Sequence, residues 1–421
     1  MTTEILSPEK QQIIHFIEDQ QENLISFLKE LVSIPSDNPP GDCQKIAEHI
    51  FKRLEEYEFE NVSINEVEEE RVKAVGRTKV SNVIGFQNFG NTQGLEITLN
   101  SHGDVVPPGL RWTQNPYGGN IVDGKLYGRG AAVSKSDIAS FTFATLALRQ
   151  LKENLNGKIS LAFTFDEETG GDIGPKWLLE KGLINPDMAI CPGFTYSLAN
   201  AHNGCLHLEV KLKGKSAHAA EPQYGHDALE AMTGVLSALY EYRKGFSEIK
   251  SNIPNVGSPN LVVGLISGGI NTNVVPDTAT IRIDRRLIPE ENPKFAEAEI
   301  RNVIVEALEN YTGVEAEVNQ ILLAHSMGPV PVNSPLVQSF AANWSKIMGG
   351  EELPIVGSPL YTDARHFYEA DIPVVLFGTG PRTLLEANGH RADEHVKVDD
   401  LIKATKIVAL TLYDLLLGQN N

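Results

Sequence analysis

The sequence predicts an α/β protein with a mainly parallel sheet, interrupted by an inserted α+β sandwich domain. Strand-like and helix-like segments alternate over the first 200 residues, which is typical of a layered α/β domain. Near Leu206 the pattern changes to strict alternation, and after about Leu323 the helix–strand pattern returns. A chain of 421 residues is long enough for this division. We expect a main domain at 1–204 and 320–421, and an inserted domain at 205–319.

Hydrophobic spacing predicts the elements of the main domain. Apolar residues at helical spacing predict a helix over 24–32, which the turn Pro39-Pro40-Gly41 follows, and a second helix over 46–54. Short apolar runs predict strands between further helices. The predicted strands are Leu95–Asn100, Lys158–Phe165, Met188–Ile190 and Pro373–Phe377, and the further helices are Ile138–Leu151 and Val398–Leu417.

The inserted domain shows the order strand, helix, strand, strand, helix. The strands are predicted at 206–212, 261–266 and 278–283, and the helices at 227–242 and 295–311. This order is typical of a small α+β sandwich. Because strand 206–212 alternates strictly, we expect it to be a half-buried edge that can pair across a two-fold axis.

Composition and charge exclude several classes of protein. The chain has 36 Lys and Arg against 55 Asp and Glu, a net charge of −19, which disfavours nucleic-acid and membrane-surface partners. No apolar run approaches the ~18 residues of a membrane span, and the first residues do not resemble a secretory signal. The three cysteines cannot form a disulfide framework. We expect a cytoplasmic protein that acts on a small molecule.

Polar side chains follow the predicted strands of the main domain. In chain order they are His102 and Asp104, then Asp166, Glu167 and Glu168, then Cys191, and then His390, Asp393 and Glu394. In open α/β sheets ligands bind beyond the carboxyl ends of the strands, so these groups are expected to converge. Imidazole, thiolate and carboxylate are zinc ligands. Of the two adjacent glutamates, one can hold a cation while the other takes a proton from water; a solvated loop is the alternative.

Taken in order, these segments resemble the dinuclear-zinc amidohydrolases, which include acetylornithine deacetylase, succinyl-diaminopimelate desuccinylase, aminoacylase and carboxypeptidase G. The matching segments are Leu31–Ser36, Ser101–Pro107, Tyr127–Ala131, Asp166–Gly170 and Gly389–Glu394. The resemblance covers nearly the whole chain. It implies a phosphorylase/hydrolase-like catalytic domain, with the inserted domain as lid and dimerisation domain of a homodimer.

The resemblance also implies roles for single residues. In the catalytic domain, His102, Glu168 and His390 correspond to metal ligands, Asp104 to the acid that orients a ligand, and Glu167 to the general base.

In the inserted domain, His218 corresponds to a residue that hydrogen-bonds the reacting carbonyl, in dimers from the opposite subunit, and Asn273 to a substrate-loop residue. Arg286 and Arg365 lie in segments that hold a substrate carboxylate, a task that suits a guanidinium fork. A structural salt bridge is the alternative for either arginine.

Two positions depart from the family pattern. Val133 stands where the family has an Asp that bridges two metals, and Asp137 follows four residues later, where we expect a helix. Cys191 stands where the family has Glu or Asp. It is either a soft ligand or a small buried residue.

We therefore expect at most one zinc or similar divalent ion per subunit, with none as the alternative. The possible anchors are His102 with Cys191, or Glu168 with His390, and the second pair is favoured because a thiol must first lose its proton.

The expected activity is hydrolysis of a small-molecule amide C–N bond in an N-acyl or N-carbamoyl amino acid, or in a dipeptide-like substrate with a carboxylate. Glu167 would serve as general base and His218 would stabilise the oxyanion. The alternative is a metal-depleted homologue that binds a small molecule, or that uses a reorganised site for other chemistry. The retained Glu167, His218 and Asn273 favour an enzyme, whereas Val133 favours the alternatives.

Overall fold

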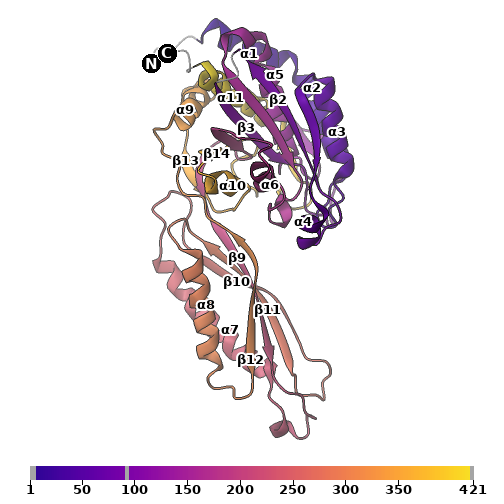
Figure 1. Cartoon of the computed structure of the whole chain (residues 1–421), viewed down its shortest axis with the longest axis vertical. Helices are drawn as coiled ribbons and strands as arrows, with labels where there is room; N and C mark the ends of the chain where they lie inside the picture. Colours follow the sequence, from indigo (N-terminus) through magenta and orange to yellow (C-terminus); the bar gives the residue numbers. More distant parts are fainter. Residues whose placement is uncertain (1–5, 91–93, 418–421) are drawn as a thin grey trace. The chain divides into compact units, whose positions relative to one another are not determined.

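The computed structural model describes residues 6–90 and 94–417 (Figure 1). The chain forms two compact units. Unit 1 contains the described residues of Met1–Asn200, Val330–Ile355 and Thr362–Asn421, and unit 2 contains Ala201–Pro329 and Val356–Tyr361. The expected boundary at 319/320 lies inside the strand β12 (Glu315–Ala324), which the sequence pattern did not reveal.

The larger sheet, built mainly from unit 1, has eight strands among the described residues, in the order β1-β2-β6-β3-β7-β14-β8-β13. The four central strands β6, β3, β7 and β14 are parallel, and the pairs β1/β2, β2/β6 and β14/β8 are antiparallel. The mainly parallel α/β sheet predicted from the sequence is therefore confirmed. The strands are β1 (Glu60–Glu66), β2 (Ser81–Phe89), β3 (Leu95–His102), β6 (Gly157–Thr164), β7 (Met188–Cys191), β8 (Leu198–His202), β13 (Ile355–Ser358) and β14 (Val374–Leu376).

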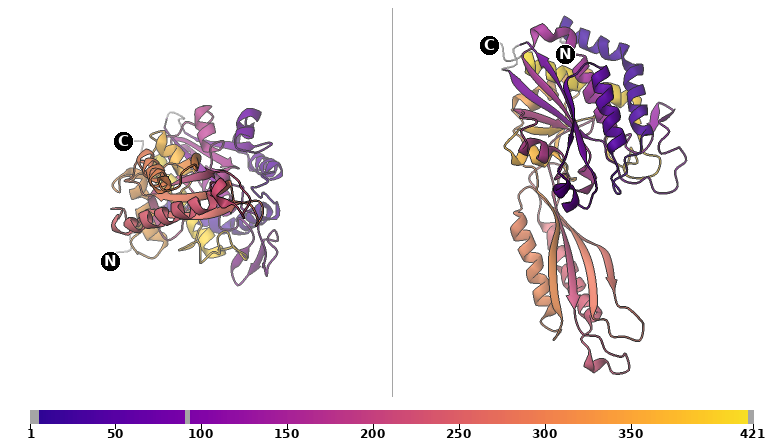
Figure 2. Two further views of the ribbon diagram at one scale, coloured as in Figure 1. Left: turned by 90° about the horizontal axis from the view of Figure 1, so that it is seen from below. Right: turned by 45° about the vertical axis from the view of Figure 1, so that its right-hand side comes forward.

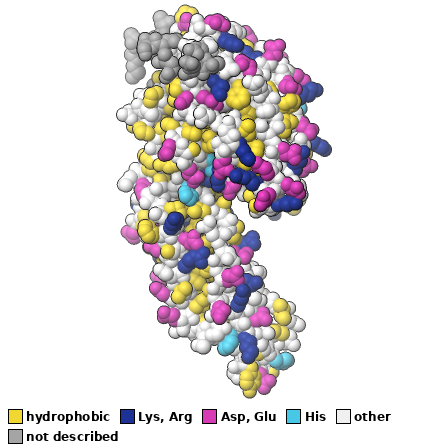
Figure 3. All heavy atoms as spheres, in the orientation of Figure 1, with side chains coloured by type: hydrophobic (Ala, Val, Ile, Leu, Met, Phe, Trp, Pro, Cys, Tyr) yellow, Lys and Arg dark blue, Asp and Glu magenta, His cyan; other side chains and the backbone are white. Residues whose placement is uncertain are grey.

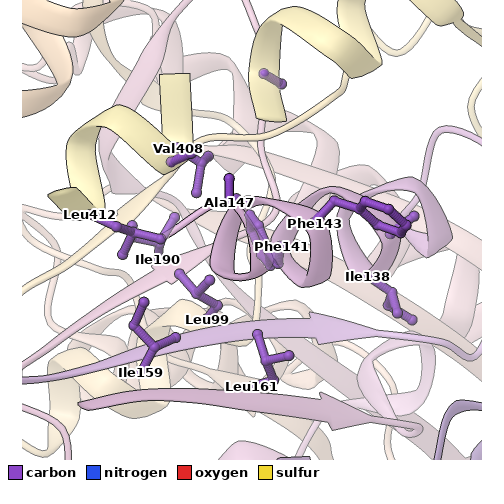
Figure 4. Packing of buried hydrophobic residues seen from close by; sticks show 14 of the residues in the cluster. Leu99, Ile138, Phe141, Phe143, Ala147, Ile159, Leu161, Ile190, Val408 and Leu412 are labelled. Atoms are coloured by element: carbon purple, nitrogen blue, oxygen red, sulfur yellow. The ribbon is translucent and has the colours of Figure 1, made fainter. Parts of the chain in front are cut away.

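Helices pack on this sheet and form the main core. The α-helices of unit 1 are α1 (Pro8–Asp19), α2 (Gln21–Ser33), α3 (Gln44–Glu56), α4 (Glu69–Ala74), α5 (Lys135–Leu146), α6 (Pro175–Glu180), α9 (Pro335–Ile347), α10 (Ala364–Glu369) and α11 (Val398–Leu417). Figure 4 shows Phe141 of α5, and Ala147 directly after this helix, packed near Val408 of α11 and over Leu99 and Ile159 of the sheet. Every residue of α5 is buried, so this helix fixes the loop that precedes it.

A small three-stranded sheet lies close to the chain segments of the candidate site. Its strands are β4 (Asn120–Val122), β5 (Lys125–Tyr127) and β15 (His395–Lys397), in the order β15-β5-β4.

None of the helices within residues 6–90 and 94–417 is long and apolar enough to cross a membrane. On the face shown in Figure 3, acidic and basic side chains are intermixed over the surface of unit 1.

Unit 2 contains a separate antiparallel sheet with the strand order β10-β11-β9-β12 among its described residues. Its elements are β9 (Gly204–Lys213), α7 (Ala228–Lys244), β10 (Asn260–Gly268), β11 (Thr278–Leu287), α8 (Pro293–Leu308) and β12. The two helices cover one face of this sheet (Figure 2), so the predicted inserted α+β fold is confirmed.

The expectation that 206–212 forms an edge strand is wrong. β9 lies between β11 and β12, and pairs with both along its length. Its alternation arises because Leu206, Leu208 and Val210 face the helices, while the side chains between them lie on the open face. An interior strand of a one-sided sheet has the same period as an edge strand, so the pattern cannot distinguish them.

Candidate active site

Two neighbouring parallel strands bring the first three candidate residues together. His102 is the last residue of β3 and pairs in register with Thr164 at the end of β6. Glu167 and Glu168 open the short turn η2 (Glu167–Thr169) that follows β6. The ligand atoms of His102, Glu167 and Glu168 all lie within 4.8 Å of one another. The predicted convergence at the carboxyl ends of these strands is therefore present.

His102 is held in one orientation by Asp104. Its Nδ1 donates to the backbone carbonyl of Asp104 at 3.0 Å, and the carboxylate Oδ1 of Asp104 lies 3.4 Å from the same nitrogen. This contact leaves Nε2 to face Oε2 of Glu167 at 3.8 Å. The other oxygen of Asp104 accepts from the Asn38 side chain at 2.8 Å and from the Glu168 N–H at 3.2 Å. Asp104 therefore links the imidazole to the glutamate turn, as an orienting acid does.

His390 joins this group through Glu168. Its Nε2 lies 3.2 Å from Oε1 of Glu168, and its backbone has a φ of 61°, an uncommon value for a residue other than glycine. Asp393 fixes the same loop, since its Oδ1 accepts from the N–H groups of Thr113 and Gln114 at 2.8 and 3.1 Å. We call His102, Glu167, Glu168 and His390 the unit 1 cluster.

Neither nearby acid takes the place of a carboxylate at Val133. Glu394 is paired with Arg129, and its Oε1 accepts from backbone N–H groups, including that of Val133 at 3.2 Å. Asp137 lies inside α5 as expected, where its Oδ1 accepts from the N–H of Thr379 at 2.9 Å. Burial raises the pKa of Asp137 to about 7. Both carboxyl groups are engaged with the backbone.

Cys191 lies at the end of β7 and is completely buried. Its sulfur lies 3.8 Å from Oδ1 of Asn100, to which the thiol donates. Burial, and next the charge of Asp363, raises the pKa of Cys191 well above its usual value. Among the residues that the structure describes, Cys191 is not in the group of ligand atoms around His102. These contacts favour a small buried residue over a soft ligand.

Acidic groups are in surplus around the unit 1 cluster. Burial raises the pKa of Glu167 and of Asp166 to about 7, and that of Asp363 well above its usual range. Burial alone would lower the pKa of His102, but Glu167 and Asp104 raise it well above its usual value. Both oxygens of Asp363 are buried without a hydrogen-bond donor. A divalent cation fits this donor set, because it would offset the excess negative charge.

Asp363 is a residue that the sequence reasoning missed. The segment Thr362–Arg365 was expected to supply Arg365 to a substrate carboxylate. The buried guanidinium of Arg365 donates to the backbone carbonyls of Thr362, at 3.1 Å, and Gly170. Its role toward a substrate stays a prediction. Asp363 packs against Gly171, whose φ is 71° and where a Cβ would collide with the carboxylate. The signal in the sequence was the Gly170-Gly171 pair, which permits this close approach.

The remaining candidates belong to unit 2. His218 forms a β-bridge with Val274, and the N–H of Ala219 donates to the carbonyl of Asn273 at 3.0 Å, so the two loops lie together. Nδ1 of His218 accepts from the N–H of Ala220 at 3.1 Å. A neutral His218 therefore carries its proton on Nε2, as a donor to a carbonyl oxygen would.

The sequence pattern of peptidase family M20/M25/M40 matches residues 98–414. An uncharacterised metallohydrolase of Methanocaldococcus jannaschii is 27% identical over 92% of this chain and 98% of its own length. A succinyl-diaminopimelate desuccinylase of Polynucleobacter necessarius is 29% identical over 82% of this chain and 92% of its own length. The solved structure of the dipeptidase Dug1p from Saccharomyces cerevisiae has the same fold, with a TM-score of 0.81, 12% identity and full coverage of both chains. This chain belongs to the peptidase family M20/M25/M40 and is a metallohydrolase of C–N bonds.

Proposed function

We propose that this chain is a cytoplasmic hydrolase of amide bonds in small substrates that carry a carboxylate: N-acyl or N-carbamoyl amino acids, or dipeptide-like molecules. The observation that carries the proposal is the geometry of η2. Glu168 lies 3.2 Å from His390, while the adjacent Glu167 faces His102 at 3.8 Å. One turn would thus supply a carboxylate to a metal ion and a second carboxylate to move a proton.

His102, Glu168 and His390 would hold one divalent cation, with zinc as the proposed metal. These are two imidazoles and a carboxylate, a ligand set that catalytic zinc takes. Val133 has no donor, and the thiol of Cys191 stays protonated in its buried position. When bound, the cation supplies a water of lowered pKa and polarises the substrate carbonyl.

Glu167 would accept the proton of the attacking water and deliver it to the leaving amine nitrogen. Asp104 would keep Nδ1 of His102 protonated, so that Nε2 stays available as a ligand. His218 would donate its Nε2 proton to the developing oxyanion. Arg286 would hold the substrate carboxylate with the N–H groups of its guanidinium that do not donate to Asp284.

The substitution Glu167→Gln tests the proposal. The amide keeps the shape of the side chain but cannot accept a proton, so kcat should fall by about 10²–10⁴. Metal content and thermal stability should stay close to wild type, and Cys191→Ser should retain turnover. Near-normal kcat in Glu167→Gln would rule out this mechanism, and a metal-free protein with no turnover on any of these substrates would favour the binding-protein alternative.

A homodimer through unit 2 is also proposed. β10 is an edge of the four-stranded sheet, and it exposes Leu265 and Ile266 at 60% and 58%. An unpaired strand with apolar side chains favours pairing with a second copy. If His218 acts on the neighbouring subunit, mixed dimers of Glu167→Gln and His218→Ala should recover part of the activity. A monomer at working concentration, or verified mixed dimers without activity, would contradict this arrangement.

A further inference from the structure

Unit 2 contains a second group of metal-ligand side chains, on the sheet face opposite α7 and α8. Cys205 and His207 lie two residues apart on β9, and Asp284 and Arg286 lie two residues apart on β11. The strand register pairs His207 with Asp284 and Cys205 with Arg286. We call these four residues the unit 2 cluster. Because side chains alternate between sheet faces, the backbone ladder directs all four to one side.

Two distances within this cluster are close to those between the ligand atoms of a metal ion. Sγ of Cys205 lies 3.6 Å from Oδ1 of Asp284, and Nε2 of His207 lies 3.3 Å from Oδ2. One ligand atom from each of the three residues lies within 4.8 Å of the others. Tetrahedral zinc, with bonds of about 2.3 Å to sulfur and about 2.0 Å to nitrogen or oxygen, sets its ligand atoms about 3.3–3.5 Å apart.

We propose that Cys205, His207 and Asp284 form a second cation site in unit 2, for a borderline-soft divalent ion such as Zn²⁺ or Co²⁺. Sulfur, imidazole and carboxylate together suit such ions better than Mg²⁺ or Ca²⁺. Cys205 is fully buried, whereas the side chains of His207 and Asp284 are 33% and 31% exposed, so the ion has an approach from solvent. A solvent molecule completes the coordination.

Arg286 competes with a cation for the carboxylate of Asp284. Its Nε and Nη2 donate to the two oxygens of Asp284 at 2.9 and 3.0 Å. A carboxylate accepts about four hydrogen bonds, and the other lone pairs of Asp284 face the Cys205 thiol and Nε2 of His207. The cation would take the place of these two contacts. Binding replaces the thiol proton of Cys205: one M–S bond forms, one S–H bond breaks, and the proton goes to solvent. The guanidinium repels the ion, so the site is weaker than a site without it.

Titration of the full chain with Co²⁺ tests the site, because thiolate ligation produces a near-ultraviolet charge-transfer band. The wild type should show a saturable band, and Cys205→Ser should lack it. Cys191→Ser and Cys43→Ser are matched controls that should keep it. His207→Gln should weaken the apparent Kd at least about tenfold, and this variant leaves the buried thiol in place. Arg286→Gln should tighten it at least about tenfold by removing a positive charge.

Three results would overturn the proposal: no thiolate band in the wild type, a band that persists in folded Cys205→Ser, or a band lost in Cys191→Ser alone. The first would leave the unit 2 cluster as a hydrogen-bonded support for Arg286. The readout needs neither substrate nor turnover, so its failure is independent of the proposed hydrolase.

Discussion

The unit 1 cluster and the unit 2 cluster shift the pKa of a carboxyl group in opposite directions. In the unit 1 cluster, burial, together with the neighbouring Glu168, raises the pKa of Glu167 to about 7. In the unit 2 cluster, burial acts in the same direction on Asp284, but His207 and Arg286 more than offset it and hold its pKa at about 2. Asp284 has two close hydrogen-bond donors, His207 and Arg286, whereas the charges of His102 and Arg365 do not offset the burial of Glu167.

This difference predicts which of the two sites has the higher affinity for a cation. Around the unit 1 cluster, Asp104, Asp166 and Asp363 add negative charge, and both oxygens of Asp363 are without a donor. The chain supplies too little positive charge there, so a cation from solution gains the most. In unit 2 the chain supplies its own cation, and a metal must compete with it. We expect the unit 1 site to fill first in any titration.

Emptying the stronger site should have the largest effect. His390→Ala removes one of three proposed ligands and leaves Glu168 without its 3.2 Å partner. Metal affinity should fall by more than the about 10–100-fold that loss of an outer partner costs. Elemental analysis after dialysis that empties the weaker unit 2 site should show about one equivalent in wild type and much less in the variant. Cys191→Ser is the control and should keep its metal, and the reverse result would restore the His102–Cys191 pair.

A carboxylate at position 133, which could bridge two metal ions, should raise the metal content of unit 1 and so increase its difference from unit 2. Two divalent ions about 3.5 Å apart repel by roughly 19 kcal/mol at an effective dielectric of 20, and a carboxylate between them offsets part of this. Val133→Asp should therefore raise the metal content from one equivalent to two, whereas the neutral Val133→Asn should leave it at one. Two equivalents tightly bound in unit 1 of the wild type would contradict the single-metal proposal.

The parts of the site that follow strand ends could be predicted from the sequence. His102, Glu167 and Glu168 come directly after apolar strands, and parallel strands bring their carboxyl ends to one sheet edge. The two-sheet organisation could be predicted for a similar reason, since the change of period near Leu206 marks the start of β9. Both predictions rest on local periodicity that tertiary structure did not override.

Other features depend on contacts between distant segments. Asn38 reaches Asp104 across 66 positions, and Asp363 meets Gly171 from another part of the chain. No local pattern encodes these pairs. The same limit explains the wrong edge strand, because the neighbours of β9 include β12, which lies about a hundred residues later. The backbone carbonyl partners of Arg365 likewise leave no trace in the sequence.

The guanidinium of Arg286 should also affect substrate binding. Arg286→Lys loses the side-on fork with Asp284, so the side chain is no longer held to meet a carboxylate. KM for carboxylate substrates should rise about tenfold, which is ~1.4 kcal/mol, with kcat little changed. Arg282→Lys is a matched control, because Arg282 lies on the same strand and pairs only with Glu209 in the contacts described. Equal KM values in the two variants would remove Arg286 from substrate binding.

The smallest expected effect is on acid stability, and its sign follows from Asp284. A carboxyl group whose folded pKa lies below its unfolded value of about 4 stabilises the fold above that pH, and this contribution is lost as the pH falls through about 2. Asp284→Asn should therefore destabilise the protein at pH 7 by about 1–3 kcal/mol, and the gap from wild type should shrink between pH 4 and pH 2.

Thermal midpoints at pH 7 and pH 3 measure this difference. Glu317→Gln is the control: Glu317 pairs with Lys213 on the same sheet, but both side chains are about half exposed, at 47% and 53%. Exposed pairs contribute little, so this variant should stay near wild type at both values of pH. A gap between Asp284→Asn and wild type that does not change with pH would mean that Asp284 acts through shape alone. The two clusters would then differ in packing rather than in charge.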